Sequence, residues 1–241
     1  MPELVVLGED GPWQQFTPEA AQVARAAHLD DPPHVFATRG ISPSTIHRVY
    51  AFRDGLVRQD HARQPQAFRW DMITETRESV SDVYLTTGGA RRYQQTRFTF
   101  ALTRRDGARV KIAGAHQAGP RAQQPPPPGP VPGSASVQCH RYFEFGKAAC
   151  AEVARARLPA ALASLDRGES VAFGSVRVSR TGLRRGMRRP VPWAGLTMRV
   201  SEGWLTIERH GSRRPVFRKS VADIPSSTLF RTVVTGLLDG S

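Results

Sequence analysis

The chain has 241 residues, a formal net charge of +13, and hydrophobic and charged fractions that are ordinary for a folded protein. Its length suits two compact domains, and its core is large enough to fold without disulfides. Two cysteines are too few for a disulfide framework, and no run of about 18 apolar residues provides a membrane span. Because the start lacks a basic region and a long apolar run, we expect no signal peptide and a cytoplasmic location.

Residues 1–40 are predicted to be an N-terminal segment with one short helix. Thr17 is a good N-cap, Pro18 suits the first helical position, and Glu19 favours the positive end of the helix. The helix is expected to end near Leu29, before Asp30-Asp31-Pro32-Pro33.

A first β domain is predicted over residues 41–113. A hairpin turns at Asp54-Gly55, a strand is expected over 68–79, and another is expected over 93–104. Phe98, Phe100 and Leu102 share one face of the latter strand, as in a half-buried antiparallel strand. The residues between these two strands, 80–92, are expected to form a loop.

Residues 114–138 are predicted to be a Pro-rich linker, centred on Pro125–Pro128. Such a segment favours extended polyproline II conformations and is best interpreted as a semi-rigid spacer, although a ligand for a partner domain is an alternative. A helix over 139–166 is expected to complete the first domain, starting near Phe145, with an apolar stripe that leaves Arg155 and Arg157 outside. Pro159 is expected to kink or divide it.

Residues 167–241 are predicted to be a second β domain. Short strands precede a final amphipathic helix, in which Leu229, Val233 and Leu237 repeat at i, i+4 and i+8. This segment also concentrates basic charge, with 14 Lys and Arg against 5 Asp and Glu. Because only 3 of the 34 basic residues are Lys, part of the Arg content is attributed to GC-rich codon usage.

The two β segments share a degenerate repeat, which favours two small domains of one kind. Gly55-Leu56 precedes Trp70 in the first copy, and Gly182-Leu183 precedes Trp193 in the second. Each Trp is expected to start a strand and to pack in a core, rather than to contact a ligand. A Gly-containing turn follows in each copy, at Asp106-Gly107 and at His210-Gly211.

Short antiparallel strands closed by one C-terminal amphipathic helix resemble the pleckstrin-homology-like (PH-like) fold. The segments that carry the likeness are Leu158–Leu162, Gly168–Gly174, Val191-Pro192-Trp193 and Ile224-Pro225. They resemble a bacterial family of unknown function with tandem PH-like domains. The resemblance implies a mainly β (α+β) fold with two partly open antiparallel β-barrels. Each would be capped by an amphipathic helix, and the Pro-rich linker would join them. It supplies no catalytic residues.

The sequence offers no catalytic constellation. His116, Cys139, His140 and Cys150 lack metal-binding spacing, and a Cys on an Ala-rich helix is usually a small buried hydrophobe. The acidic residues Asp54, Asp71 and Asp82 are interpreted as turn residues or surface partners. We therefore expect no enzyme, metal or cofactor, and keep an enzyme of unknown class only as an alternative.

Two basic clusters are the best functional lead. The first comprises Arg184, Arg185, Arg188 and Arg189, and the second comprises Arg213, Arg214, Arg218 and Lys219. Arg donates paired hydrogen bonds to phosphate, so clusters that converge would bind anionic lipid or phosphate. The alternative is a solvated Arg-rich face.

We therefore expect a non-enzymatic binding or scaffold protein that engages a protein partner or an anionic membrane surface. A peptide strand added to an exposed sheet edge is one way to bind a protein. Nucleic acid is the remaining alternative, with Phe217 and Trp204 as candidate stacking residues, although Trp204 fits a core equally well.

Overall fold

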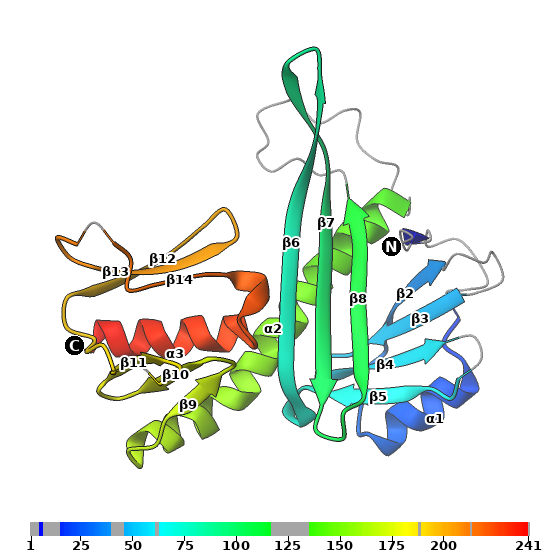
Figure 1. Ribbon diagram of the computed structural model, residues 1–241. Helices are drawn as coiled ribbons and strands as arrows, with labels where there is room; N and C mark the ends of the chain where they lie inside the picture. The colour runs from blue at the N-terminus through cyan, green and yellow to red at the C-terminus, as the bar shows by residue number, and fades with distance from the viewer. Residues whose placement is uncertain are drawn as a thin grey trace. The chain divides into compact units, whose positions relative to one another are not determined.

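The computed structural model describes residues 5–6, 15–39, 46–60, 63–116, 135–187, 189–212 and 214–240. The chain divides into two compact units, the first built from Met1–Thr74 and Val80–Ala149, the second from Glu75–Ser79 and Cys150–Ser241. Strands outnumber helices in both (Figure 1). The described residues form four antiparallel sheets, and none of the four closes into a barrel. The expected mainly β class is therefore confirmed.

The first unit holds a five-stranded sheet in which each strand pairs with the next along the chain. Its strands are β1 (Val5–Val6), β2 (His34–Arg39), β3 (Ile46–Ala51), β4 (Gly55–Asp60) and β5 (Gln66–Arg69). Helix α1 (Pro18–Ala26) begins where Thr17 was predicted to cap it, since the Thr17 hydroxyl accepts a hydrogen bond from the Ala20 N–H at 3.3 Å. Ala20 and Ala24 of α1 are buried against Tyr50 of β3 in one apolar cluster.

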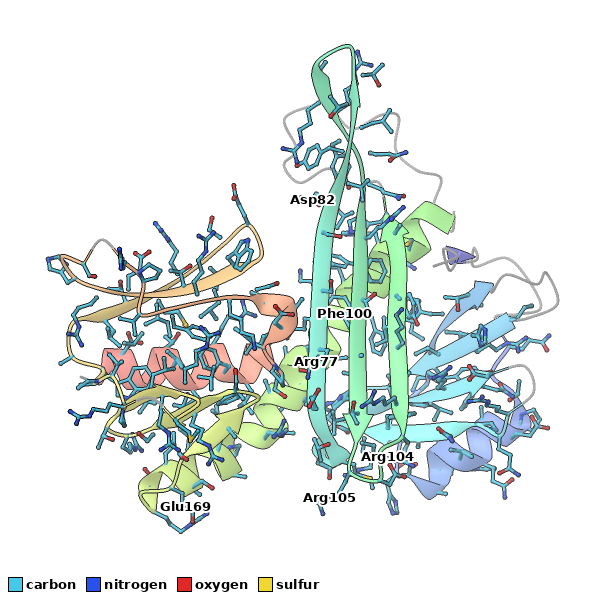
Figure 2. All side chains as sticks on the ribbon, viewed as in Figure 1. Arg77, Asp82, Phe100, Arg104, Arg105 and Glu169 are labelled. Atoms are coloured by element: carbon cyan, nitrogen blue, oxygen red, sulfur yellow. The ribbon has the colours of Figure 1, made fainter. Side chains whose placement is uncertain are left out.

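A three-stranded sheet follows, with β6 (Ile73–Thr87), β7 (Ala90–Arg104) and β8 (Arg109–His116) in that order. The prediction of a loop over 80–92 was wrong, because these residues extend both strands into one long hairpin that turns at Gly88-Gly89 (Figure 1). The predicted inward face of β7 is confirmed: Phe98, Phe100 and Leu102 are buried. Phe100 and Asp82 mark β7 and β6 in Figure 2.

Helix α2 (Ala135–Asp166) begins about ten residues before the predicted Phe145 and runs through Pro159 as one helix. Its first half belongs to the first unit, where Tyr142 packs on Phe36 of β2 with ring centroids 4.9 Å apart. Phe143 packs on Phe100 of β7 at 5.9 Å. The N-terminal half of α2 thus covers both sheets of this unit. The centre of the predicted linker, residues 117–134, lies outside the described residues.

The second unit contains two three-stranded sheets and a C-terminal helix. The first sheet has the order β11-β10-β9, and the second has the order β12-β13-β14. Their bounds are β9 (Val171–Phe173), β10 (Val176–Ser179), β11 (Gly182–Arg185), β12 (Leu196–Ser201), β13 (Trp204–Arg209) and β14 (Phe217–Ser220). Val191 adds a bridge to Leu183 beside β11. Helix α3 (Ser227–Asp239) buries the predicted apolar face, including Leu229, Val233 and Leu237, in the core of this unit.

The two repeat tryptophans make the same kind of hydrogen bond, because each indole N–H donates to a backbone carbonyl shortly before the repeat glycine. The Trp70 indole N–H donates to the Arg53 carbonyl at 2.8 Å, and the Trp193 indole N–H donates to the Ser179 carbonyl at 2.9 Å. Both rings are buried, as predicted. The prediction that each Trp starts a strand was wrong. Trp70 begins a 3-10 turn (Trp70–Met72), and Trp193 lies in a bend before β12.

The repeat glycines are also equivalent. A Cβ on Gly55 would lie 2.6 Å from the Phe68 carbonyl oxygen, and one on Gly182 would lie 2.2 Å from that of Val191. Phe68 and Val191 each stand two residues before the repeat Trp. Only glycine permits this approach of two backbones. The shared Gly and Trp positions are therefore framework of the two folds.

Candidate anion-binding surface of the second unit

The sheet formed by β9, β10 and β11 carries three arginines and no carboxylate. Val176, Val178 and Leu183 point into the core, so the alternating residues point outward. Arg177 of β10 lies directly opposite Arg184 of β11 in the antiparallel register. The outer face therefore presents two guanidinium groups side by side.

Within the described residues, neither Arg177 nor Arg184 has a carboxylate partner. Other arginines of the same unit do: Arg180 contacts Asp166, and Arg167 donates to Glu169 at 2.8 Å. The two facing arginines are thus distinguished by their direct apposition without a counter-charge. Arg177 was not among the residues singled out from the sequence.

The rest of the first basic cluster follows the same hairpin. Arg185 ends β11 opposite buried Val176, so strand alternation directs it to the other face from Arg184, although its side chain is exposed. Arg189 is exposed in the segment that returns to Val191. Arg188 lies outside the described residues.

The second basic cluster is on the other sheet and is split between two faces. Arg218 of β14 is exposed and lies over the ring of Trp204 at 4.8 Å. Lys219 pairs with buried Leu205 across the strands, so it points to the opposite face from Arg218. Arg214 precedes β14 and is exposed, while Arg213 lies outside the described residues.

Trp204 and Phe217 were candidates for base stacking. Phe217 is buried in the core of the second unit, so that suggestion was wrong. Trp204 is 43% exposed on the outer face of β13, where an aromatic ring is accessible to a ligand. The alternative placement of Trp204 in the core is excluded.

A polar network at the start of α3 was not anticipated. Glu78 of β6 accepts hydrogen bonds from the hydroxyls of Ser227 and Thr228, each at 2.7 Å, and from the Thr228 N–H at 3.3 Å. The Arg157 guanidinium donates to the Ser226 hydroxyl at 3.0 Å. Arg157 is therefore partly buried and engaged, which corrects its predicted position outside the packed face of α2.

Of the potential metal ligands, His116 and His140 lie side by side, with ring centroids 5.4 Å apart. Within the described ranges, no group of three or more His, Cys, Asp or Glu could hold a metal ion. Both cysteines are buried, and the Cys139 thiol donates to the Ala115 carbonyl at 2.8 Å. Burial raises the pKa of Cys139 to about 11 and also raises the pKa of Cys150. Neither thiol is therefore an activated nucleophile at neutral pH.

The three aspartates interpreted as turn or surface residues occupy different settings. Asp71 is exposed and pairs with Arg69 at 3.1 Å, and Asp82 accepts from the Thr96 hydroxyl at 2.6 Å. The carbonyl of Asp54, just before the hairpin turn, accepts from the Trp70 N–H at 3.2 Å. These contacts are structural, and none of them pairs two carboxylates.

No family model, no curated protein and no solved structure matches this chain. Among the described residues, no helix is both long and apolar enough to span a membrane.

Proposed function

We propose that the chain is a non-enzymatic binding protein built from two PH-like domains. After β1 and α1 of the first unit, both units follow one order of elements: four strand positions, then three strands, then a helix. In the first unit these are β2–β5, β6–β8 and α2, and in the second they are β9–β11 with Val191, β12–β14 and α3. This order, together with the matching Trp hydrogen bonds, supports a duplicated PH-like architecture. In this proposal, the strands of each unit together form one partly open barrel.

We further propose that the second unit binds an anionic membrane surface through the sheet formed by β9, β10 and β11. The observation that carries this proposal is the facing pair Arg177 and Arg184. Directly opposite like charges destabilise an antiparallel pair. Two unit charges about 6 Å apart in water repel by about 0.7 kcal/mol. A phosphate between the two guanidinium groups would replace that repulsion by charge-assisted hydrogen bonds.

A membrane partner fits the exposure and spread of these charges. Arg177, Arg184, Arg185 and Arg189 come from one short sheet and its return segment, without a carboxylate in the three strands. Each basic residue near an anionic surface contributes about 1 kcal/mol of attraction. Several together would hold the protein peripherally on the cytoplasmic leaflet, which is the location proposed here.

Co-sedimentation with liposomes tests this proposal. Binding should rise with the fraction of phosphatidylserine in phosphatidylcholine vesicles and should fall as salt is raised, because exposed charges are screened. The double variant Arg177→Gln, Arg184→Gln should lose most of the binding. The matched control is Arg155→Gln, Arg167→Gln, which removes the same charge from two exposed residues that already have carboxylate partners. Binding that ignores lipid charge, or equal losses in the two double variants, contradicts the proposal.

Nucleic acid is the second candidate, favoured by the exposed Trp204 and its Arg218 neighbour. A gel shift with mixed single-stranded nucleic acids distinguishes it from the membrane surface, since stacking makes that affinity sensitive to Trp204→Ala. Liposome binding should be unaffected by this substitution. Strong, salt-dependent nucleic-acid binding without liposome binding would replace the membrane proposal.

A further inference from the structure

Strand β12 leaves one edge of its sheet open. Among the described strands β12 pairs with β13 alone, from Leu196 opposite Arg209 to Ser201 opposite Trp204. The two-residue turn between them, Glu202-Gly203, has positive φ at both positions, 51° and 75°. A loop of this kind makes Ser201 and Trp204 a hydrogen-bonded pair.

The open edge follows from that pairing. Hydrogen-bonded and non-hydrogen-bonded pairs alternate along an antiparallel ladder, so the N–H and C=O groups of Met198 and Val200 point away from β13. Within the part of the chain that the structure describes, these groups have no backbone partner on that side. Natural edges are usually protected by proline, a bulge or several charges. β12 has one charged residue, Arg199, and no proline.

A groove adjoins this strand. It has a volume of about 470 Å³ and is lined by Met198 of β12 and by Thr228, Arg231, Thr232 and Thr235 of α3. Val200, further along the same face of β12, is 43% exposed. The groove therefore combines an apolar side with a row of hydroxyl groups and one cation.

The charge of the groove comes from Arg231. Its Nη2 donates to the Thr228 hydroxyl at 3.2 Å, and its Nε is buried without a hydrogen-bond partner among the described residues. The nearby Glu78 already accepts three hydrogen bonds from the start of α3 through one carboxylate oxygen. The groove lining itself has no acidic residue. A carboxylate on a ligand would therefore supply the negative charge that the groove lining lacks.

The length of the groove sets the size of its occupant. Thr228 and Thr235 stand seven residues apart on α3, which is about 10 Å along a helix axis. An extended strand covers that distance with about three residues, of which the first and third point to the same face. Two alternate side chains of an added strand would therefore reach into the groove.

We propose that the open edge of β12 binds an extended acidic peptide segment of a partner protein by strand addition. Its backbone pairs with the free N–H and C=O groups of Met198 and Val200. One apolar side chain packs on Met198 and Val200, and a carboxylate two residues away accepts hydrogen bonds from Arg231. This site is separate from the sheet proposed to bind membranes.

Selection of a displayed library of random linear nine-residue peptides on the whole protein tests this inference. The selected peptides should share an apolar residue and an Asp or Glu at positions i and i+2. Affinity is then measured by fluorescence polarisation with one labelled selected peptide. Methylation of its backbone nitrogens, one at a time, should weaken binding at every second position within the paired segment. An effect at every second position is the signature of strand addition. Because only the peptide is altered, this test requires no change to the protein.

Two protein variants locate the peptide. Arg231→Gln should weaken binding about tenfold or more, because it removes a charge-assisted hydrogen bond. Val200→Pro should abolish strand pairing while the fold is kept, since an edge strand tolerates proline where its N–H faces solvent. Arg199→Gln, on the outer face of the same strand, and the Arg177→Gln, Arg184→Gln double variant are the matched controls and should bind normally.

Several outcomes overturn the inference. Failure to select any peptide does so, as does uniform tolerance of N-methylation along the selected peptide. Binding that survives Arg231→Gln but is lost in the Arg177→Gln, Arg184→Gln variant would place the peptide on the other sheet. If Val200→Pro fails to fold, the methylation series on the unchanged protein decides alone.

Discussion

The sharpest stability prediction concerns the two tryptophans of the second unit. Trp193 is 4% exposed, lies in the apolar core with Leu183 and Leu196, and donates its indole N–H to the Ser179 carbonyl at 2.9 Å. Truncation to alanine removes the ring and leaves a cavity, which costs about 3–5 kcal/mol for a buried aromatic residue. For a unit of about 100 residues, this loss lowers the melting temperature by roughly 12–40 °C.

A second variant separates the two contributions of Trp193. Trp193→Phe keeps an aromatic ring in the core but removes the N–H that reaches the Ser179 carbonyl. Loss of one partner of a buried hydrogen bond costs about 1–3 kcal/mol. Its destabilisation should therefore lie below that of Trp193→Ala.

Trp204 provides the control within the same unit. Its side chain is 43% exposed, and the Arg218 guanidinium lies over its ring at 4.8 Å. A cation–π contact at an exposed site is worth about 0.5–1 kcal/mol, so Trp204→Ala should change stability by about 1 kcal/mol or less. Urea unfolding followed by circular dichroism measures all three variants, with the slope m checked for constancy. A Trp193→Ala midpoint close to that of Trp204→Ala would refute the placement of Trp193 in the core.

Three further predictions rest on other contacts. Glu78→Ala should cost about 1–3 kcal/mol in urea unfolding, because it leaves donors at the start of α3 without an acceptor; an unchanged midpoint would show that water replaces the carboxylate. Gly182→Ala should destabilise by about 2 kcal/mol or more, since its Cβ would meet the Val191 carbonyl, whereas Gly236→Ala, in open space on α3, should stabilise by about 0.5–1 kcal/mol. Equal melting temperatures for the two Ala variants would contradict this. Burial lowers the pKa of His116 below its usual 6.5, so the stability it favours is present above that value and is lost as pH falls through the lowered pKa. Between pH 7 and pH 5, the melting temperature should fall less for His116→Phe than for the unchanged protein. An equal fall in both proteins would contradict the assignment.

Local chemistry made the repeat framework predictable from the sequence. The Gly-Leu and Trp positions mark a close backbone approach and a buried ring, and both arise from residues near one another in the chain. The apolar face of α3 was equally readable, because helical spacing places Leu229 and Val233 on one side. These features depend on short-range periodicity.

The long hairpin of β6 and β7 was missed because its far half lacks the signal that identifies a strand. Residues such as Val80, Tyr84 and Leu85 are exposed, so no alternation of buried and solvated positions marks that part of the hairpin. The Arg91 guanidinium lies 4.0 Å from the centre of the Tyr84 ring, which shows that contacts between the two strands replace a core there. Apolar and polar residues alternate along a strand when one face of the strand is buried. A two-stranded hairpin that is solvated at most positions therefore shows little alternation.

The candidate site was predicted in part. Basic character on the β11 hairpin was visible in Arg184 and Arg185, but Arg177 became relevant only through the register that sets it opposite Arg184. The spread of Arg218 and Lys219 over two faces follows from strand alternation and could have been read from a correct strand assignment. The role of Glu78 could not, because its partners lie about 150 residues later in the chain.

That separation has a consequence for synthesis. Glu75–Ser79 belong to the second unit, yet the hydrogen-bond partners of Glu78 at the start of α3 are made about 150 residues later. At a translation rate of about 5–20 residues per second, the segment waits about 8–30 s for helix α3 to leave the ribosome. The sequence of this segment, Glu-Thr-Arg-Glu-Ser, is polar throughout, so the segment can stay exposed to water until α3 is made. The second unit therefore completes its fold only after α3 has left the ribosome, with a strand segment that was made about 150 residues earlier.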